Sequence, residues 1–583
     1  MFSSQHKTQA FIAHKEILCD ALTPLSALDT LGAKVLLESA YNETGKDRYS
    51  ILILSEAFRI SKQDKKHFLT HHKAGAPTKV PLDVIFSDLK LSQTPSQAKK
   101  SRAKKRADSE TSSLKGAHMS ESRSESTLSE SSPEANSESK AHIYAPNTNF
   151  LRDLCLIRTL SPNPTDSVPS HLPLPLGGAG YVGYEFFAEI EEVEFSNPPL
   201  YDAPECSFIF GRDFLIFDHL FDRLHIISVG YAHEDEGALK PLEWEEAYLK
   251  SPAHNATQPS SHSERIKQRV EILAFALGSL SASAQSQVQD EKRSGKVKSA
   301  TTEAEFSAIV REIKHRIYQG DMLQCVSSQS LTLASSLPPL SAYRKLRHQN
   351  PSPYMFYYDF DDFVVLGASP EIMLRLKTQG SKSLLTLRPI AGTRPRGVSV
   401  AKDLDLEQEL LNDSKELSEH LVLVDLARND AGKVSAGGGV SVISRNKIER
   451  YSRVMHIVSE VQGILDTKHF DKIDAFRAVF PAGTLTGAPK IEAIKTIESL
   501  ESSARGIYGG AIGYFTYDED MDFAIAIRTA VYQKGVYYLR SGAGIVYDSD
   551  EAKEFKETQN KMQALLDMLG VSEEISESSE LER

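Results

Sequence analysis

Residues 415–430, KELSEHLVLVDLARND, decide how the rest of this sequence is organised. They are predicted to form a helix. Apolar residues at the spacings i, i+4 and i+7 make its expected buried stripe: Leu417, Leu421 and Val424. Glu416 and Glu419 are three residues apart, so their carboxylates share a neighbouring face of the helix. Two carboxylates on one face repel each other unless a positive charge lies between them. The pattern is compatible with a solvated acidic edge or with a cation-binding face.

A second helix, predicted near the end of the sequence, repeats this acidic spacing. Its charged side consists of Glu551, Glu554, Glu557 and Lys561. Its apolar surface consists of Phe555, Met562, Leu565 and Leu566. Two helices with carboxylates at this spacing can close on one hard cation. All-oxygen ligands favour Mg²⁺ over zinc, and Mg²⁺ usually keeps open positions for substrate oxygens.

Length and composition limit the class of protein. The sequence has 583 residues, of which 40% are hydrophobic and 25% charged, as expected for a globular protein of more than one domain. A net charge of -12 does not indicate a nucleic-acid binder. Its four cysteines lack CxxC spacing, so we expect no disulfide framework and a reducing, cytoplasmic location: Cys19, Cys155, Cys206 and Cys325. No apolar signal segment or membrane-spanning run is predicted.

Changes in composition along the sequence predict its organisation. Residues 1–279 form an N-terminal region with an insert at about 92–141, which is rich in Ser, Glu, Lys and Ala. The insert has too few large apolar residues for their burial to offset the entropy lost on ordering. It is therefore predicted to be disordered. Residues 280–300 are interpreted as a linker, 301–570 as the catalytic domain and 571–583 as an acidic tail.

Alternating strands and helices with short connections predict an α+β fold, with antiparallel sheets packed as a sandwich and helices on the outer faces. Residues 384–390 are predicted to be a strand that leads into a turn at 392–397. Residues 523–531 are predicted to be one strand, and residues 542–544 a turn. The glycine-rich string at 175–185 is interpreted as a strand that another backbone approaches closely. A similar string recurs at 509–515.

The second half resembles the chorismate-utilising enzymes, and in particular the large (component I) subunits of anthranilate synthases. Besides the opening helix, the matching strings occur in family order: 352–356, 367–371, 389–397, 450–456, 483–490, 527–530 and 542–546. The first half matches through residues 36–39 and the segment around Gly177, whereas the insert departs from the family pattern.

The resemblance implies roles for two catalytic residues and four metal-binding carboxylates. Chorismate is a dianionic cyclohexadiene whose ring hydroxyl must be protonated before it leaves. Glu371 matches the general acid, and His456 matches a residue for the later loss of pyruvate, through proton transfer or positioning. Mg²⁺ would be bound directly by Glu419 and Glu557, with Glu416 and Glu554 holding metal-bound waters.

The resemblance also implies how the substrate carboxylates are bound. Arg528 offers a planar fork for bidentate pairing. The other implied substrate contacts are Lys561, Tyr508, Thr484, Gly392, Thr393 and the backbone N–H groups of Gly542, Ala543 and Gly544.

Two positions favour amination that yields anthranilate. Water-adding relatives carry a lysine base where this sequence has Gln324, and aminodeoxychorismate synthases often carry a lysine nucleophile where it has Ala391. No glutaminase signature occurs, and Cys325 lies in a predicted strand, where packing is the expected role. We therefore expect a separate glutaminase subunit that supplies ammonia within a hetero-oligomer. The alternatives are aminodeoxychorismate synthesis and a non-catalytic module that binds an aromatic amino acid.

Feedback inhibition by tryptophan is the last expectation. Glu38 and Ser39, together with Pro353, Tyr354 and Met355, resemble the family's tryptophan-binding strings. Glu38 can pair with an ammonium group and Ser39 can hydrogen-bond it. Tyr354 and Met355 offer an aromatic face and a thioether for an indole. The alternative is that these residues are only a strand end and part of the core.

Overall fold

The structure is a computed structural model that describes residues 8–19, 22–38, 48–73, 76–89, 149–164, 167–235, 245–250, 261–280, 297–299, 301–451 and 454–571, with a few single positions between them. The predicted insert, most of the predicted linker, nearly all of the acidic tail and Ser39 lie outside the described residues.

The described strands pair antiparallel and form two layers. The first layer, in order of pairing, contains β1 (Phe11–Leu18), β8 (Arg223–Gly230), β7 (Cys206–Asp218), β3 (Tyr49–Gln63), β2 (Val35–Glu38), β11 (Tyr354–Asp359), β12 (Val364–Ser369), β21 (Thr529–Gln533), β22 (Val536–Ile545) and β10 (Gln324–Ala334). The short strands β9 (Val297–Ser299) and β18 (Gly487–Ala488) also pair with β10.

The second layer starts from the same two long strands, β3 and β7. On the β3 side it contains β4 (Lys66–Lys73) and β5 (Ala76–Pro81). On the β7 side it contains β6 (Ala179–Val182), β19 (Ala511–Phe515), β20 (Met521–Ile525), β13 (Ile372–Gln379), β14 (Lys382–Leu387) and β17 (Val454–Leu465). The strands β15 (Ile390–Pro395) and β16 (Ser435–Arg450) pair with β17.

Irregular pairing explains how β3 and β7 serve both layers. Their register shifts at several points between Ile53 and Phe58 of β3. Such bulges bend a strand and increase its twist. As a result, the first part of β3 pairs with β2, whereas its last part, from Arg59, pairs with β4.

Strands from both halves of the sequence meet in each layer. In the first layer β2 pairs with β11, and in the second layer β6 pairs with β19. The second pairing joins the two glycine-rich strings, with Gly180 opposite Gly513. A Cβ atom on Gly180 would lie 2.7 Å from the Cα of Phe208, and one on Gly513 would lie 2.8 Å from the Cα of Phe523. The predicted close approach of another backbone is therefore confirmed.

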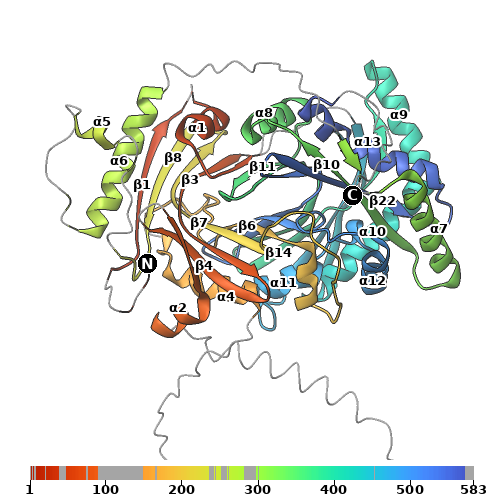
Figure 1. The fold of residues 1–583 in the computed structure, drawn as a ribbon, viewed down its shortest axis with the longest axis horizontal. Helices are drawn as coiled ribbons and strands as arrows, with labels where there is room; N and C mark the ends of the chain where they lie inside the picture. The colour runs from red at the N-terminus through yellow and green to blue at the C-terminus, as the bar shows by residue number, and fades with distance from the viewer. Residues whose placement is uncertain are drawn as a thin grey trace, which may run out of the picture.

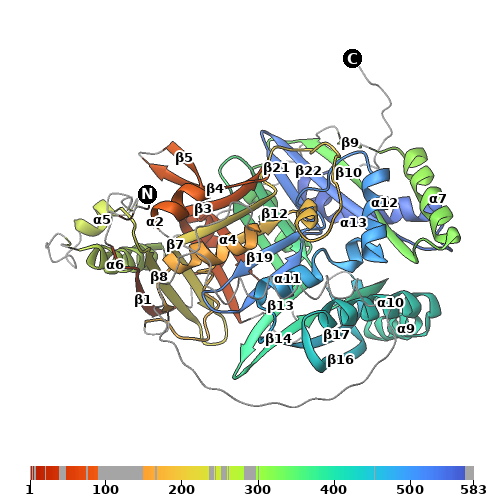
Figure 2. The same ribbon diagram turned by 90° about the horizontal axis from the view of Figure 1, so that it is seen from below.

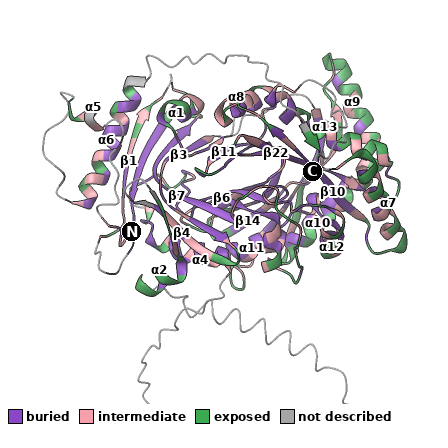
Figure 3. Cartoon of the chain, in the orientation of Figure 1, coloured by how far each residue is buried: buried purple, intermediate pink, exposed green. Residues whose placement is uncertain are grey.

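Helices cover the outer faces, as predicted (Figure 1, Figure 2). They are α1 (Pro24–Leu31), α2 (Leu82–Leu89), α4 (Phe150–Ile157), α5 (Glu245–Leu249), α6 (His262–Leu280), α7 (Glu303–Gln319), α8 (Pro339–Gln349), α9 (Val400–Asn412), α10 (Ser414–Gly432), α11 (Lys472–Val479), α12 (Lys490–Leu500) and α13 (Glu551–Leu569). Buried residues follow the strands, and exposed residues gather on the outward sides of the helices (Figure 3). No helix in the described part of the chain is long and apolar enough to cross a membrane.

The opening stretch forms α10, but its buried stripe differs from the predicted one. The carboxylate of Asp413 caps the helix by accepting the backbone N–H groups of Lys415 (3.0 Å) and Glu416 (3.2 Å). Leu421 is 45% exposed, so its predicted burial is wrong. The buried residues are His420, Leu423, Val424, Ala427, Asp430 and Ala431. The helix is rotated in this way because β15, β16 and β17 pack against its His420 side.

Three predicted boundaries are also wrong. The turn expected at 392–397 lies largely within β15, where Gly392 adopts a φ of 63° beside an irregularity in the pairing with β17. The strand expected over 523–531 is interrupted at Arg528, whose φ is 49°. The turn expected at 542–544 is part of β22, which pairs with β10 as far as Ile545.

Candidate active site

Glu371 lies in the short link between β12 and β13, with its side chain turned into the protein. It is 6% exposed, and the hydroxyl of Thr484, on the 3-10 helix η5 (Gly483–Leu485), donates a hydrogen bond of 3.0 Å to its Oε1. Burial raises the pKa of Glu371 to about 8, although the Thr484 hydrogen bond and the charges of Lys561 and Arg528 oppose this rise. At neutral pH the carboxyl group therefore holds a proton that it can give away.

Arg528 supplies a positive charge close to this acid. It occupies the break between β20 and β21, and its half-buried guanidinium has no hydrogen-bond or ion-pair partner within the part of the chain that the structure describes. Burial lowers the pKa of Arg528, and Tyr451 and Glu371 raise it. A planar cation of this kind suits a carboxylate ligand.

The substrate-contact residues predicted on β22 and α13 lie together. Lys561 donates a hydrogen bond of 2.9 Å to the carbonyl of Gly542 and forms an ion pair of 2.8 Å with Glu557. The hydroxyl of Tyr508 lies 3.0 Å from the position that a Cβ on Gly542 would take. On its other edge β22 pairs with β21 only as far as Leu539. Along residues 542–544 that edge has no partner strand among the described residues.

His456, on β17, is buried and neutral. Its Nδ1 lies 2.9 Å from the carbonyl of Gly392 and 3.1 Å from the hydroxyl of Thr393. Since a carbonyl can only accept, we place the proton on Nδ1. Burial, together with the charges of Arg528 and Lys561, lowers the pKa of His456 to about 4, although the hydrogen bond with Gly392 opposes this shift. Its Nε2 is buried without a hydrogen-bond partner in the described residues, so a lone pair remains available there.

Shared neighbours show which predicted residues lie near one another. Arg528 and Lys561 act on the pKa of both Glu371 and His456. Thr484 and Tyr508 join them through the contacts above. The structure therefore brings the predicted catalytic and substrate-contact residues together from β15, β17, β22, α13, η5 and two strand links.

The four predicted metal-binding carboxylates lie on α10 and α13. Burial raises the pKa of Glu416, Glu419 and Glu554, and neighbouring carboxylates, including Glu557 across the helices, raise it further. Lys415 lies 3.6 Å from Glu419, and Lys561 pairs with Glu557. In this arrangement, no three acidic, histidine or cysteine side chains among the described residues stand close enough to hold a metal ion. The chemistry of this donor set still suits a hard cation, which would relieve the repulsion that raises the three pKa values.

Glu416 connects the carboxylates with the His456 side of the site. Its Oε2 lies 3.4 Å from the position that a Cβ on Gly392 would take, and the Gly392 carbonyl contacts His456. Arg394, two residues along β15, lies 3.6 Å from Glu416.

The residues expected to select the nucleophile also border this region. The side-chain amide of Gln324 lies 2.8 Å from the position of a Cβ on Gly544. Ala391 pairs with Ile457 beside the irregular step at Gly392. Cys325 is fully buried and its thiol lies 3.8 Å from the Ala493 carbonyl; burial raises its pKa to about 12, so its predicted packing role is confirmed.

A cavity of about 450 Å³ lies between the two halves of the sequence. Its lining includes Glu38 from β2 and the predicted tryptophan-binding residues Pro353, Tyr354 and Met355. Met355 is paired with Glu38 in the sheet. The hydroxyl of Tyr354 donates a hydrogen bond of 2.8 Å to Asp522, which also lines the cavity.

Glu38 already has partners in this structure, which sequence reasoning missed. Arg347 of α8 donates hydrogen bonds of 2.6 and 3.0 Å to its two carboxylate oxygens, and the hydroxyl of Tyr343 donates one of 2.8 Å. A ligand ammonium group would share this carboxylate with Arg347.

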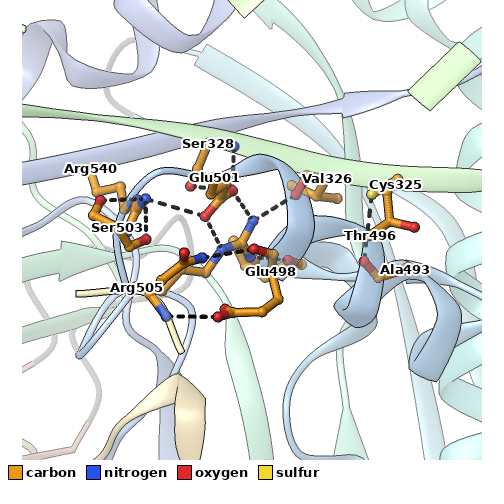
Figure 4. Close-up of polar contacts among 12 residues, drawn as sticks. Cys325, Val326, Ser328, Ala493, Thr496, Glu498, Glu501, Ser503, Arg505 and Arg540 are labelled. Carbon is orange, nitrogen blue, oxygen red and sulfur yellow. Dashed lines mark hydrogen bonds and ion pairs between the residues drawn. The ribbon is translucent and has the colours of Figure 1, made fainter. Parts of the chain in front are cut away.

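A buried ion-pair network beside the active site was also missed. Glu501, at the end of α12, lies between Arg505 and Arg540 (Figure 4). The sequence did contain a signal for this network. Glu501 and Arg505 are the charged residues of the short segment between α12 and β19, and charges that become buried require partners.

Comparison with known proteins identifies the family of the chain. The family model of the chorismate binding enzymes matches residues 103–567. The chain is similar to "Anthranilate synthase component 1" of Neisseria meningitidis serogroup B, with 40% identity over 69% of the chain and 76% of that protein. It is also similar to the protein of the same name from Spirochaeta aurantia, with 33% identity over 95% of the chain and 94% of that protein.

Solved structures share the architecture. Anthranilate synthase component I from Streptococcus pneumoniae TIGR4 aligns with a TM-score of 0.63 and 26% identity, covering 94% of this chain and 98% of that one. MenF, the menaquinone-specific isochorismate synthase of Escherichia coli, aligns with a TM-score of 0.60 over 97% of this chain and 96% of that one. Its identity of 15% shows a common fold alone.

Proposed function

The chain belongs to the chorismate binding enzyme family, and we propose that it is an anthranilate synthase component 1, a lyase that forms anthranilate and pyruvate from chorismate and ammonia. The observation that carries this proposal is the buried Glu371, which accepts a hydrogen bond from Thr484, has its pKa raised to about 8 by burial and interacts with the charges of Arg528 and Lys561. An acid beside two cations suits a dianionic substrate with a hydroxyl leaving group.

The first step is assigned to Glu371. Arg528 and Lys561, with the hydroxyl of Tyr508 and the backbone of β22, hold the two substrate carboxylates. Glu371 gives its proton to the ring hydroxyl, which leaves as water, while ammonia forms a carbon–nitrogen bond ortho to the ring carboxylate. Thr484 holds the Glu371 carboxyl in place during this transfer.

The second step is loss of the enolpyruvyl group as pyruvate, with departure of a ring proton, which makes the ring aromatic. The Nε2 of His456 is neutral, buried and unpartnered among the described residues, so it is suited to receive a proton or to orient the departing group. Its Nδ1–H donates to the Gly392 carbonyl, which holds the ring in one orientation.

We assign Mg²⁺ binding to the acidic faces of α10 and α13. Glu419 and Glu557 would hold the ion directly, and Glu416 and Glu554 would hold its waters. When bound, the ion would balance the ring carboxylate and draw electron density from the ring. In the structure Lys415 pairs with Glu419 and Lys561 pairs with Glu557. These two ion pairs would have to break when the metal ion binds.

Ammonia is proposed to come from glutamine through a separate glutaminase subunit in a hetero-oligomer, because the sequence has no glutaminase signature. Ala391 and Gln324, in place of two lysines, favour direct amination. The second candidate, aminodeoxychorismate synthesis, would leave the enolpyruvyl group on the product.

Tryptophan is the proposed inhibitor, with its site in the 450 Å³ cavity. Residues of both halves line this cavity, so a ligand there could act on the relative position of strands that also carry active-site residues. Its lining includes Tyr354, Met355 and Glu38.

One experiment tests the activity. Purified chain is mixed with chorismate, Mg²⁺ and an ammonium salt, and anthranilate is followed by fluorescence. Anthranilate and pyruvate should form in equal amounts. Accumulation of 4-amino-4-deoxychorismate or isochorismate without anthranilate would overturn the assignments of Ala391 and Gln324. The predicted cytoplasmic location stays a prediction.

A further inference from the structure

We propose that Arg505, held by Glu501, is a positioning residue that sets Thr484 and its partner Glu371 relative to the strands that carry residues 542–544. The inference rests on the proposed function, since it assigns Glu371 as the acid. The Arg505 side chain is 3% exposed, and its hydrogen bonds go to Glu501, Leu485 and Val326, none of which is a predicted substrate contact.

The first observation is how firmly Glu501 holds this arginine. The Oε1 of Glu501 accepts hydrogen bonds from Arg505 (2.6 Å) and from the backbone and hydroxyl of Ser328 (both 2.8 Å). Its Oε2 accepts one from the Nε of Arg505 at 3.0 Å and pairs with Arg540 at 3.2 Å. Both carboxylate oxygens are therefore satisfied, and the guanidinium plane of Arg505 has a defined orientation (Figure 4).

The second observation is where the remaining N–H groups of Arg505 point. One donates a hydrogen bond of 2.7 Å to the carbonyl of Leu485, next to Thr484. Another donates one of 2.7 Å to the carbonyl of Val326 on β10. Val326 is paired with Gly544, and Ser328 with Gly542. A single planar group thus connects the segment that holds the acid with the strand that supports the carboxylate-binding backbone.

The third observation is the aromatic packing on the same guanidinium. Its carbon lies 4.7 Å from the ring centre of Tyr184 and 5.8 Å from that of Tyr508. The hydroxyl of Tyr508 in turn lies close to Gly542. Arg505 therefore contacts three segments next to the substrate site: η5 at Leu485, β10 at Val326, and Tyr508.

The Glu501–Arg505 pair is better suited to fixing geometry than to adding stability. A buried ion pair is weak evidence for stability, because desolvation offsets much of the attraction. A guanidinium can bond to Glu501, Leu485 and Val326 at once because its donors are spread in a rigid fork. A lysine at this position would keep the charge but would reach only part of this set.

Loss of this positioning has a specific kinetic signature. The hydrogen bond from Thr484 lowers the pKa of Glu371, so a displaced Thr484 should let that pKa rise. The other charged groups around Glu371 are Arg528 and Lys561, with Arg388 and Asp430 lining the same small pocket, and none of them changes in the test. Activity needs the protonated form of Glu371. The alkaline limb of the pH profile of activity should therefore move to higher pH.

The test compares Arg505→Lys and Glu501→Gln with Thr484→Val, using the purified chain with chorismate, Mg²⁺ and ammonium. We expect kcat to fall by about tenfold to a hundredfold, the scale of a misplaced catalytic group, while KM changes less. The alkaline limb of kcat should move upward in all three variants. In the double variant Arg505→Lys/Thr484→Val it should move no further than in Thr484→Val alone, since coupled residues are not additive.

Arg212 offers a matched control, because it is 4% exposed, pairs with Glu234 and donates to the Val229 carbonyl at 2.9 Å, in the first half. Arg212→Lys should lower the melting temperature and leave the pH profile in place. If Arg505→Lys and Glu501→Gln also lower the melting temperature without moving the pH profile, the inference is wrong.

If both of these variants fail to fold, Ser328→Ala replaces them, because it removes one neutral donor to Glu501. Ser328→Ala must then show the upward shift of the alkaline limb for the inference to stand. A wild type that makes no anthranilate would instead contradict the proposed function.

Discussion

At the scale of single residues, burial determines which groups can exchange protons at neutral pH. Glu371 and His456 share the charges of Arg528 and Lys561, yet burial moves their pKa values in opposite directions, to about 8 and about 4. Desolvation disfavours whichever form is charged, so the carboxyl keeps its proton and the imidazole stays neutral. These opposite shifts suit the roles proposed for the two residues, an acid and a proton acceptor.

Replacing Glu371 by Gln should leave chorismate binding nearly intact and slow turnover by at least about a hundredfold, the usual scale for losing a positioned acid. In the wild type kcat should fall as pH rises through about 8, because the deprotonated carboxylate cannot donate. Binding is measured by calorimetry and turnover by anthranilate fluorescence. Loss of chorismate binding together with normal turnover of the bound fraction would make Glu371 a binding residue.

At the scale of elements, α10 and α13 bring like charges together, and this arrangement predicts a metal requirement. Glu419→Gln and Glu557→Gln should each abolish activity with little loss of fold, because each removes a proposed Mg²⁺ ligand. They should also weaken the Mg²⁺-dependent rise in melting temperature expected of the wild type. Asp425→Asn is the control on α10, since Asp425 is 62% exposed and pairs only with the neighbouring Arg428 among the described residues. Normal turnover of either Glu variant without added metal would contradict the site.

The edge of β22 gives a second prediction at this scale. A Cβ on Gly542 would lie 2.6 Å from the backbone carbonyl of Ser327 and 3.0 Å from the Tyr508 hydroxyl, so Gly542→Ala should raise KM for chorismate and lower stability. A Cβ on Gly544 would meet only the flexible amide end of Gln324, at 2.8 Å. Gly544→Ala should therefore be the milder change. Equal KM values for the two variants would show that this edge does not contact substrate.

At the scale of the whole molecule, the two halves of the sequence are joined by β2–β11 and β6–β19, and the 450 Å³ cavity lies at the first of these junctions. Tyr354→Ala should weaken inhibition by tryptophan at least about tenfold, because the indole would lose its contact with an aromatic ring. The free energy of such a contact corresponds to a change in affinity of about this size. Activity without tryptophan should change much less. Tyr318→Ala is the matched control, since Tyr318 on α7 is 75% exposed. If millimolar tryptophan did not inhibit the wild type, the proposed tryptophan site would be wrong.

The amino-acid sequence alone predicted the fold class, the acidic spacing on α10 and α13, and the position of Glu371. These features depend on local periodicity or on short matching motifs, so they need no knowledge of which segments meet. Glycine is also a local signal for a helix end: α7 ends at Gly320, which adopts a φ of 89°.

Only the tertiary structure decided which partners those residues meet. Leu421 is exposed because β15, β16 and β17 lie on the other side of α10, and residues 542–544 are a strand because β10 pairs with them. The pairs Glu38–Arg347 and Glu501–Ser328 join residues 309 and 173 positions apart. Such contacts depend on how elements pack in three dimensions, and neither residue of a pair carries a local signal of the other.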